Sequence, residues 1–179
     1  MNAKLSVSSL ILICILLIIS TSVWGRSIIT GQVVDAETGK PIEKAAVHIE
    51  WLKSGSGPPG LAGYERVEVA EDLTDAQGRF KAPNYSTLFK DYRMAVYKKG
   101  YVCWSSEDIF PTYEERKGFR LKNGMVIKLE RFREEYSREK HAIFTTVSST
   151  SRRGGGLFDN AIKSEDKIVD EIFRKKMGE

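Results

Sequence analysis

The chain has little cysteine and little histidine, and both shortages limit its chemistry. Its two cysteines are Cys14 and Cys103, and its two histidines are His48 and His141. Cys14 lies in an apolar N-terminal run, so a processed chain would keep Cys103 alone and could form no internal disulfide. Cys103 stands in the apolar string YVCW, which favours a buried small side chain over a redox site. The core must therefore hold the fold without a covalent link.

The chain also lacks a strong excess of one charge. Lys and Arg number 28 against 24 Asp and Glu, which gives a formal net charge of +4. Proteins that bind nucleic acid usually concentrate basic residues on one face or in a tail. The near balance therefore gives no reason to predict a nucleic-acid partner. A length of 179 residues allows one domain of ordinary size with extensions.

Long hydrophobic runs are absent except at the N-terminus. Lys4 is followed by the apolar string LILICILLII at residues 10–19 and then by STSVWG. This order predicts a signal peptide over residues 1–25, with cleavage after Gly25. The run from residue 5 to 24 also approaches the roughly 20 residues that cross a bilayer, so an uncleaved membrane anchor stays open. We predict an exported protein, periplasmic or associated with the cell envelope, that contacts the membrane only if this segment is retained.

Beyond the leader, short runs of β-branched and aromatic residues alternate with Gly, Pro, Asn and Asp, which predicts an all-β fold. The predicted strands cover residues 28–34, 46–52, 66–73, 78–82, 92–98, 101–105 and 125–130. In the second strand Val47, Ile49 and Trp51 lie on one face, and His48 and Glu50 lie on the other. We predict that the first face belongs to the core and that the second meets solvent.

Two turn strings suggest how these strands connect. In DAETGKPI, Gly39 can take the positive φ that reverses the chain, and Pro41 fixes φ at the entry to the next strand. In TDAQGRF, Asp75 can cap a tight turn, and Gly78 can take the left-handed position before Phe80. Both strings predict hairpin connections.

The pattern changes at residue 131, and residues 131–179 predict a helical extension. Phe132, Tyr136 and Ile143 are spaced for one stripe of a helix. Glycine and serine at residues 148–156 predict a flexible linker.

A second amphipathic helix is predicted at residues 157–177. Asp159 is its expected N-cap, and Lys175 and Lys176 lie at the end that favours cations. The apolar stripe of this helix either folds back onto the sheets or docks on a partner or a membrane surface.

Four strings occur in an order known from one family. They are Gly-x-Val-x-Asp with its Thr-Gly-x-Pro turn at residues 31–41, the strand at 46–51, TDAQGRF at 74–80 and KKGYV at 98–102. Together they resemble the carboxypeptidase regulatory-like domain over about residues 28–130. The resemblance implies a transthyretin-like (prealbumin-like) antiparallel β-sandwich of about seven strands in a domain at residues 26–130. Similar modules accompany zinc carboxypeptidases, outer-membrane receptors and surface adhesion proteins, so the resemblance implies a fold and no activity.

Catalytic patterns known from related enzymes are absent. A zinc carboxypeptidase needs His-x-x-Glu, but Trp51 follows His48 at that spacing and Phe144 follows His141. A transthyretin-like hydrolase that opens a purine-derived ring ends in Tyr-Arg-Gly-Ser, whereas this chain ends in RKKMGE. A pairing of Cys103 with His141 stays open, although the sequence shows no orienting group for it. We therefore predict a protein that is not an enzyme and that has no cofactor or metal, with a hydrolase as the last alternative.

Two tyrosines are the candidate ligand-binding residues. The string at residues 53–64 is rich in Gly, Pro and Ser and predicts a long exposed loop, either a spacer or a binding loop that displays Leu61 and Tyr64. Tyr113 is predicted in a second loop, and flat aromatic rings suit sugars and peptides.

The first hypothesis for function is a non-catalytic binding or structural accessory module of the cell envelope, with an envelope protein as partner and the C-terminal helix as a contact. The alternative is a carbohydrate-binding module with a glycan partner. On the first hypothesis, deletion of residues 148–179 leaves a folded sandwich that loses its partner.

Overall fold

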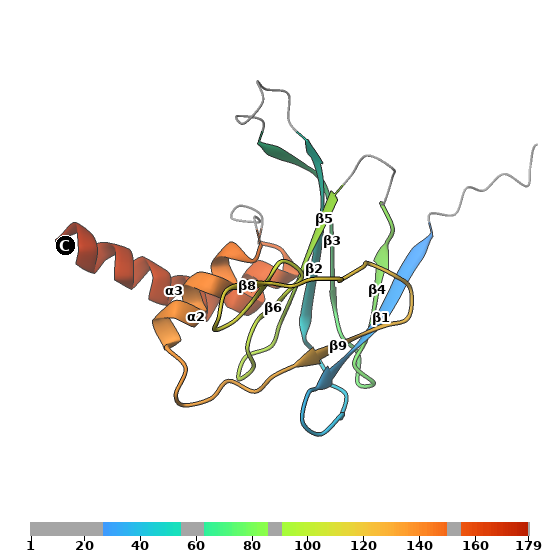
Figure 1. The fold of residues 1–179 in the computed structure, drawn as a ribbon, viewed down its shortest axis with the longest axis horizontal. Helices are drawn as coiled ribbons and strands as arrows, with labels where there is room; N and C mark the ends of the chain where they lie inside the picture. Colours follow the sequence, from blue (N-terminus) through green and yellow to red (C-terminus); the bar gives the residue numbers. More distant parts are fainter. Residues whose placement is uncertain (1–26, 55–62, 86–90, 150–154, 179) are drawn as a thin grey trace, which may run out of the picture.

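A computed structural model describes residues 27–54, 63–85, 91–149 and 155–178 (Figure 1). The expected leader at residues 1–25 lies outside these ranges, as does Leu61. Among the described residues, none of the helices combines the length and the apolar character that crossing a bilayer requires.

The first sheet has the strand order β4-β1-β9. β1 spans Ile28–Asp35, β4 spans Arg79–Pro83 and β9 spans Met125–Leu129. β1 pairs antiparallel with β4 and parallel with β9. At the centre of β1, Gly31 lets the Phe80 ring lie against the backbone, where a Cβ would collide with it. This close approach explains the glycine that opens the first sequence motif.

The second sheet has the strand order β3-β2-β5-β6, and all of its pairs are antiparallel. Its strands are β2 (Ala46–Ser54), β3 (Tyr64–Leu73), β5 (Asp91–Tyr97) and β6 (Trp104–Ser105). Two short strands, β7 (Asp108–Ile109) and β8 (Glu114–Glu115), pair with each other in a separate two-stranded sheet.

The seven predicted strands are confirmed in place, with ends that differ by a few residues, whereas β7 and β8 were not predicted. The largest difference in length is at residues 101–105, where only Trp104–Ser105 form β6. The prediction of an antiparallel sandwich is wrong for β1 and β9, which run parallel. Parallel neighbours need a long connection, and nearly the whole domain separates these two strands in the chain.

The two sheets pack face to face around an apolar core. β2 contributes Val47, Ile49 and Trp51 to it, as alternation predicted. The first sheet contributes the following buried residues: Ile29, Val33, Phe80, Ala82, Met125, Ile127 and Leu129. The β-sandwich is therefore confirmed at the level of two facing sheets with a shared core.

The other face of the second sheet does not meet solvent. His48 and Glu50, which we predicted to be exposed, are only 1% and 0% exposed. The prediction was wrong because the helix α3 (Leu157–Met177) covers this face, with Phe158 and Ile162 buried against it. Alternation tells the two faces of a strand apart, but it does not say what lies over each.

The helix α2 (Arg138–Val147) begins later than we predicted. Residues 131 and 132 still pair like a strand, because Arg131 bridges Tyr101 and the Phe132 N–H donates to the Gly100 carbonyl at 3.0 Å. The side chain of Ser137 then caps the helix by accepting the Lys140 N–H at 3.3 Å. The predicted stripe that started at Phe132 is therefore wrong.

The bounds predicted for α3 are confirmed, but its predicted cap is not. Gly156 occupies the N-cap position and Asp159 lies in the first turn. Lys175 and Lys176 lie in the last turn, as predicted. Figure 1 shows α2 and the first half of α3 beside the second sheet, while the C-terminal half of α3 projects past the body of the protein. Folding back onto the sheet is thus the observed arrangement for the first half of this helix.

In the string DAETGKPI, Asp35 stabilises a turn. One carboxylate oxygen of Asp35 accepts the N–H groups of Glu37 and Thr38 at 3.0 and 2.9 Å, which closes the turn after β1. The other oxygen accepts from Arg131 at 2.8 Å and from the Tyr101 hydroxyl at 3.1 Å. The Thr38 N–H contributes most to lowering the pKa of Asp35 to about 2, against the effect of burial.

In the string TDAQGRF, Thr74, Asp75 and Gly78 stabilise a second turn. Thr74 donates its hydroxyl to the Ile42 carbonyl at 2.6 Å and accepts the Ala45 N–H at 2.8 Å. Asp75 accepts the Arg79 N–H at 2.8 Å, and Gly78 has a φ of +70°. The residues that define both motifs therefore have a structural role, which is hydrogen bonding to the backbone of the turns.

Candidate functional site

Tyr64 is the first residue of β3, so its predicted place in a loop is wrong. Its ring is 59% exposed, and the Arg93 guanidinium lies 5.9 Å from the ring centroid. With Tyr92 and Glu107, these residues line a hollow of about 340 Å³.

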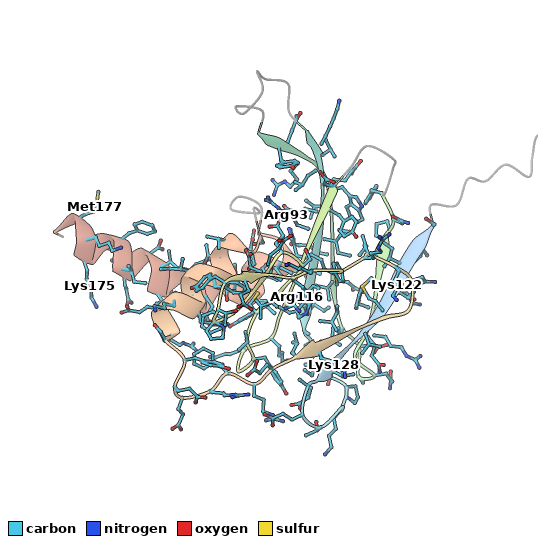
Figure 2. All side chains as sticks on the ribbon, in the orientation of Figure 1. Arg93, Arg116, Lys122, Lys128, Lys175 and Met177 are labelled. Atoms are coloured by element: carbon cyan, nitrogen blue, oxygen red, sulfur yellow. The ribbon has the colours of Figure 1, made fainter. Side chains whose placement is uncertain are left out.

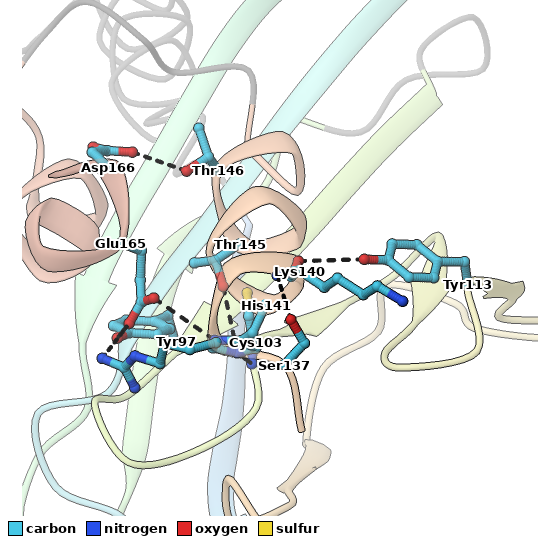
Figure 3. A network of polar contacts seen from close by, with 11 residues as sticks. Tyr97, Cys103, Tyr113, Ser137, Lys140, His141, Thr145, Thr146, Glu165 and Asp166 are labelled. Atoms are coloured by element: carbon cyan, nitrogen blue, oxygen red, sulfur yellow. Dashed lines mark hydrogen bonds and ion pairs between the residues drawn. The ribbon is translucent and has the colours of Figure 1, made fainter. Parts of the chain in front are cut away.

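Tyr113 was predicted in a loop, and it lies in the turn between β7 and β8. It is 47% exposed, but its ring packs against Phe110 and Phe144, with centroids 6.2 and 5.7 Å apart. Its hydroxyl donates to the Lys140 carbonyl of α2 at 3.3 Å (Figure 3). Tyr64 contacts β5 and Tyr113 contacts α2, so the two candidate residues do not form one site.

The structure does bring Cys103 and His141 together (Figure 3). The backbone N–H of Cys103 donates to Nε2 of His141 at 3.0 Å. Nε2 must therefore carry the lone pair, and the ring proton lies on Nδ1, which is 3.8 Å from a carboxylate oxygen of Glu165. Glu165 also accepts the Tyr97 hydroxyl at 2.8 Å and lies 3.4 Å from the Arg138 guanidinium.

This cluster resembles a catalytic triad in composition but differs from one in its bonds. The nitrogen of His141 that would take a proton from the thiol already accepts a backbone N–H. Cys103 is 2% exposed, and burial raises the pKa of its thiol to about 12. A buried thiol that stays protonated is a poor nucleophile.

Sequence reasoning missed Glu165, although the sequence held a signal for it. Phe158, Ile162, Glu165 and Val169 follow one another at spacings of four, three and four, which places the carboxylate on the buried stripe of α3. Burial alone raises the pKa of Glu165, but His141, Tyr97 and Arg138 outweigh it, and the net shift is downward. The group is thus held as a charged partner inside the helix–sheet interface.

A second buried histidine ties the start of α3 to the sheet. Nδ1 of His48 donates to one oxygen of Glu71 at 2.9 Å, and Nε2 lies 3.7 Å from Glu50. The other oxygen of Glu71 accepts the Leu157 N–H at 2.7 Å. Because the N-cap residue Gly156 has no side chain, Glu71 supplies the acceptor and the negative charge that a helix N-terminus favours.

A groove of about 900 Å³ lies between β9 and the chain at residues 102–104 and 116–120. Five cationic side chains line it: Arg116, Lys117, Arg120, Lys122 and Lys128. Figure 2 labels three of them around the segment that leads from β8 into β9. Within the described parts of the chain, no ion pair joins any of the five to a carboxylate.

The groove contains one carboxylate, Glu130, and that group is already engaged. It accepts the Tyr136 hydroxyl at 2.7 Å and lies 2.8 Å from the Arg133 guanidinium. The five cations therefore give the groove a positive potential that its own residues leave uncompensated.

Aromatic rings form part of the groove wall. The rings of Trp104 and Phe119 meet edge to face at 5.0 Å, and the Arg116 guanidinium lies 4.7 Å from the Trp104 ring centroid. Arg116 also donates to the Ser105 carbonyl at 2.6 Å, which holds it in place, and partial burial lowers its pKa. The sequence does not mark this segment as a binding site, because its cations alternate with apolar residues and form no block of charge.

Among the described residues, no group of three His, Cys, Asp or Glu side chains is placed to hold a metal ion.

Comparisons with known proteins found distant structural likenesses. The C-terminal domain of the shaft pilin spaA from Lactobacillus rhamnosus GG matches 59% of this chain and 97% of its own length, at 17% identity and a TM-score of 0.32. A Streptococcal ancillary pilin matches 60% of this chain and 30% of its own, at 15% identity and a TM-score of 0.29. A 9R-lipoxygenase from Cyanothece matches 66% of this chain and 22% of its own, at 14% identity and a TM-score of 0.31.

At TM-scores this low, the likenesses carry no argument about this chain. This chain spans less than a third of the ancillary pilin and of the lipoxygenase. No family model and no curated protein matches it.

Proposed function

We propose that this chain is an exported, non-catalytic β-sandwich that binds a partner protein in the cell envelope, with the groove beside β9 as its binding surface. The apolar N-terminal run supports export, either through a cleaved signal peptide or with the segment kept as an anchor. No cofactor or metal is part of the proposal.

The single observation that carries this proposal is the uncompensated charge of the groove. Four of its cations, Lys117, Arg120, Lys122 and Lys128, are exposed without a carboxylate partner among the described residues, next to half-buried aromatic rings. Such a combination of apolar wall and convergent polar groups is typical of a binding site. The group that most resembles a nucleophile, Cys103, adjoins the groove but is only 2% exposed and packs in the helix–sheet interface.

The proposal includes membership in the carboxypeptidase regulatory-like family, which the sequence motifs resemble. Asp35, Thr74, Asp75 and Gly78 each hold a turn, which is the role that a carboxypeptidase regulatory-like, transthyretin-like module would give them. A module of this kind needs no active site of its own.

The carbohydrate alternative lacks a specific observation in its favour. Tyr64 and Tyr113 lie on different elements, and Tyr113 is held by α2. The end of α3 offers a further contact with a protein partner, because Phe173 and Met177 are 58% and 78% exposed.

Site-specific photo-crosslinking tests the proposal in cells that make the protein. A photoreactive amino acid replaces Arg120 in the groove, Phe173 at the end of α3, or Lys81 on β4 as the control. We expect position 120 to form an adduct with a protein of the envelope fraction and position 81 to form none. No adduct from position 120, or equal adducts from positions 120 and 81, would contradict the groove as the binding surface.

A further inference from the structure

We infer that the groove binds an extended acidic polypeptide segment, which joins the first sheet as a new strand beside β9. This inference rests on the proposed function and names the chemistry of the partner.

Among the described residues, the outer backbone edge of β9 is unpaired at Val126 and Lys128, whereas Glu130 just after the strand accepts the Val102 N–H at 2.8 Å. In a parallel pair, alternate residues of a strand turn both their N–H and their C=O toward the neighbour. The Ala36 N–H donates to the Leu129 carbonyl at 2.8 Å, so Leu129 faces β1, and alternation gives the same direction to Ile127 and Met125. Val126 and Lys128 must then turn their backbone groups away from β1, and both residues line the groove.

The opposite edge of the same sheet is closed. On β4, the backbone N–H of Lys81 donates to the Asp72 carboxylate of β3 at 2.7 Å. A side chain from the second sheet thus occupies the position that an added strand would use. Since β9 is the other edge strand of this sheet among the described residues, strand addition is expected there.

The side chains around this edge specify the sequence of the added strand. Its residues would alternate between the wall formed by Trp104 and Phe119 and the rim that carries Lys122 and Lys128. Apolar residues suit the wall, and carboxylates suit the rim. The fitting segment therefore alternates acidic and apolar residues over about five positions, the length of β9.

Hydrogen exchange measured with a defined peptide tests the inference. The probe is an acetylated and amidated hexapeptide of alternating Glu and Val, added to the purified protein. We expect the amides of Val126 and Lys128 to exchange at least about tenfold more slowly with peptide, while that of Lys81 does not change. Unchanged exchange at Val126 and Lys128 with saturating peptide would overturn strand addition.

Modified peptides separate strand addition from attraction of charge alone. N-methylation of the three residues whose N–H groups point toward β9 should abolish binding, whereas N-methylation of the other three should leave it within about threefold. The same hexapeptide with Lys in place of Glu should not bind. Binding that tolerates both methylated forms, or an anionic polysaccharide that binds equally well, would overturn the inference.

Protein variants locate the site. The double variant Lys122→Glu and Lys128→Glu should bind the Glu-Val peptide with an affinity lower by about tenfold or more. Lys81→Glu on the closed edge should change the affinity for this peptide by less than about twofold. Equal losses in both proteins would contradict the placement.

Cations on an edge strand can also serve only to prevent pairing between edges. In that case no peptide would bind and the double variant would self-associate, which light scattering detects. The crosslinking at position 120 is an independent readout: an adduct there without peptide binding would reject strand addition and leave the proposed function intact.

Discussion

The two faces of the second sheet are both buried, yet they are covered in different ways. Toward the first sheet, β2 presents Val47, Ile49 and Trp51 to an apolar core. Toward the helices, the same strand presents His48 and Glu50, and α3 brings Glu165 to the interface. An apolar core is stabilised by burial in proportion to area and has no preferred direction. Buried charges instead need particular partners. Most other positions of the helices on the sheet would leave a buried charge without a partner, so these charges restrict how the helical layer packs.

Removal of the helical layer should have the largest effect. Deletion of residues 148–179 is expected to abolish cooperative folding, because it uncovers the face that holds His48 and Glu50. Loss of Phe158 packing alone should cost about 3–5 kcal/mol, out of the roughly 5–15 kcal/mol that stabilise a typical domain. Deletion of residues 174–179, of which 174–178 are described and project past the body, should change the free energy of unfolding by less than about 1 kcal/mol.

Urea unfolding followed by circular dichroism measures both deletions. This expectation replaces the one drawn from the sequence, in which the sandwich folds without residues 148–179. A shortened chain that unfolds cooperatively with native sheet content would show that the helical layer is dispensable.

In the apolar core, Trp51→Ala should cost about 3–5 kcal/mol. The expected loss is the same at about pH 6 and about pH 8, because the cluster around Trp51 contains no group that titrates in this range. Urea titrations at the two pH values check this. A loss that depends strongly on pH would mean that the two faces are coupled.

On the helix side, His48→Ala should cost about 3 kcal/mol at acidic pH, since it removes the partner of buried carboxylates. Burial by itself lowers the pKa of His48, but the carboxylates of Glu50 and Glu71 outweigh burial, so its folded pKa is above the ordinary value of 6.5. The folded state therefore holds this proton more tightly than the unfolded state. The resulting stability is complete below about pH 6.5 and is lost as the pH rises through the folded pKa.

Unfolding free energies measured across this range should fall with rising pH in the wild type and should fall less in His48→Ala. His141→Gln is the matched control, because His141 is as buried as His48 but its Nε2 accepts the Cys103 N–H, a role that the side-chain oxygen of Gln can take. This variant should keep the pH dependence that His48 causes. Equal slopes in all three proteins would contradict the assignment.

The smallest expected effect concerns Cys103 in the same layer. Cys103→Ala should cost about 1 kcal/mol, and the native thiol should resist iodoacetamide at about pH 8, since burial raises its pKa to about 12. Mass spectrometry of the labelled protein, native and in urea, gives the comparison. Rapid labelling of the native thiol would contradict this expectation and would indicate that Cys103 and His141 form a reactive pair.

Local sequence signals predicted much of the fold. Alternation, glycine and proline placed seven strands and the bounds of α3, because these signals depend on backbone geometry within a few residues. The same signals missed the start of α2, since residues 131 and 132 pair with residues 100 and 101, about thirty positions earlier. A local pattern cannot report a partner at that distance.

The candidate site was harder to predict for a related reason. Tyr64 and Tyr113 were chosen as aromatic residues in loops. The groove is instead lined by Ala36 and by residues between 102 and 130 that match no binding motif. Lys122 and Lys128 acquire a shared role only because β9 is an edge strand that lies across from Trp104. Sheet order therefore creates this surface.

The sequence by itself determined that short amphipathic strands and turns form a sandwich, and that Cys103 is buried, because apolar alternation and turn chemistry act locally. Only the tertiary structure decided that His48, Glu50 and Glu165 are buried and that the edge of β9 stays open. Burial of a polar side chain and exposure of a backbone edge both depend on which distant segment lies over them.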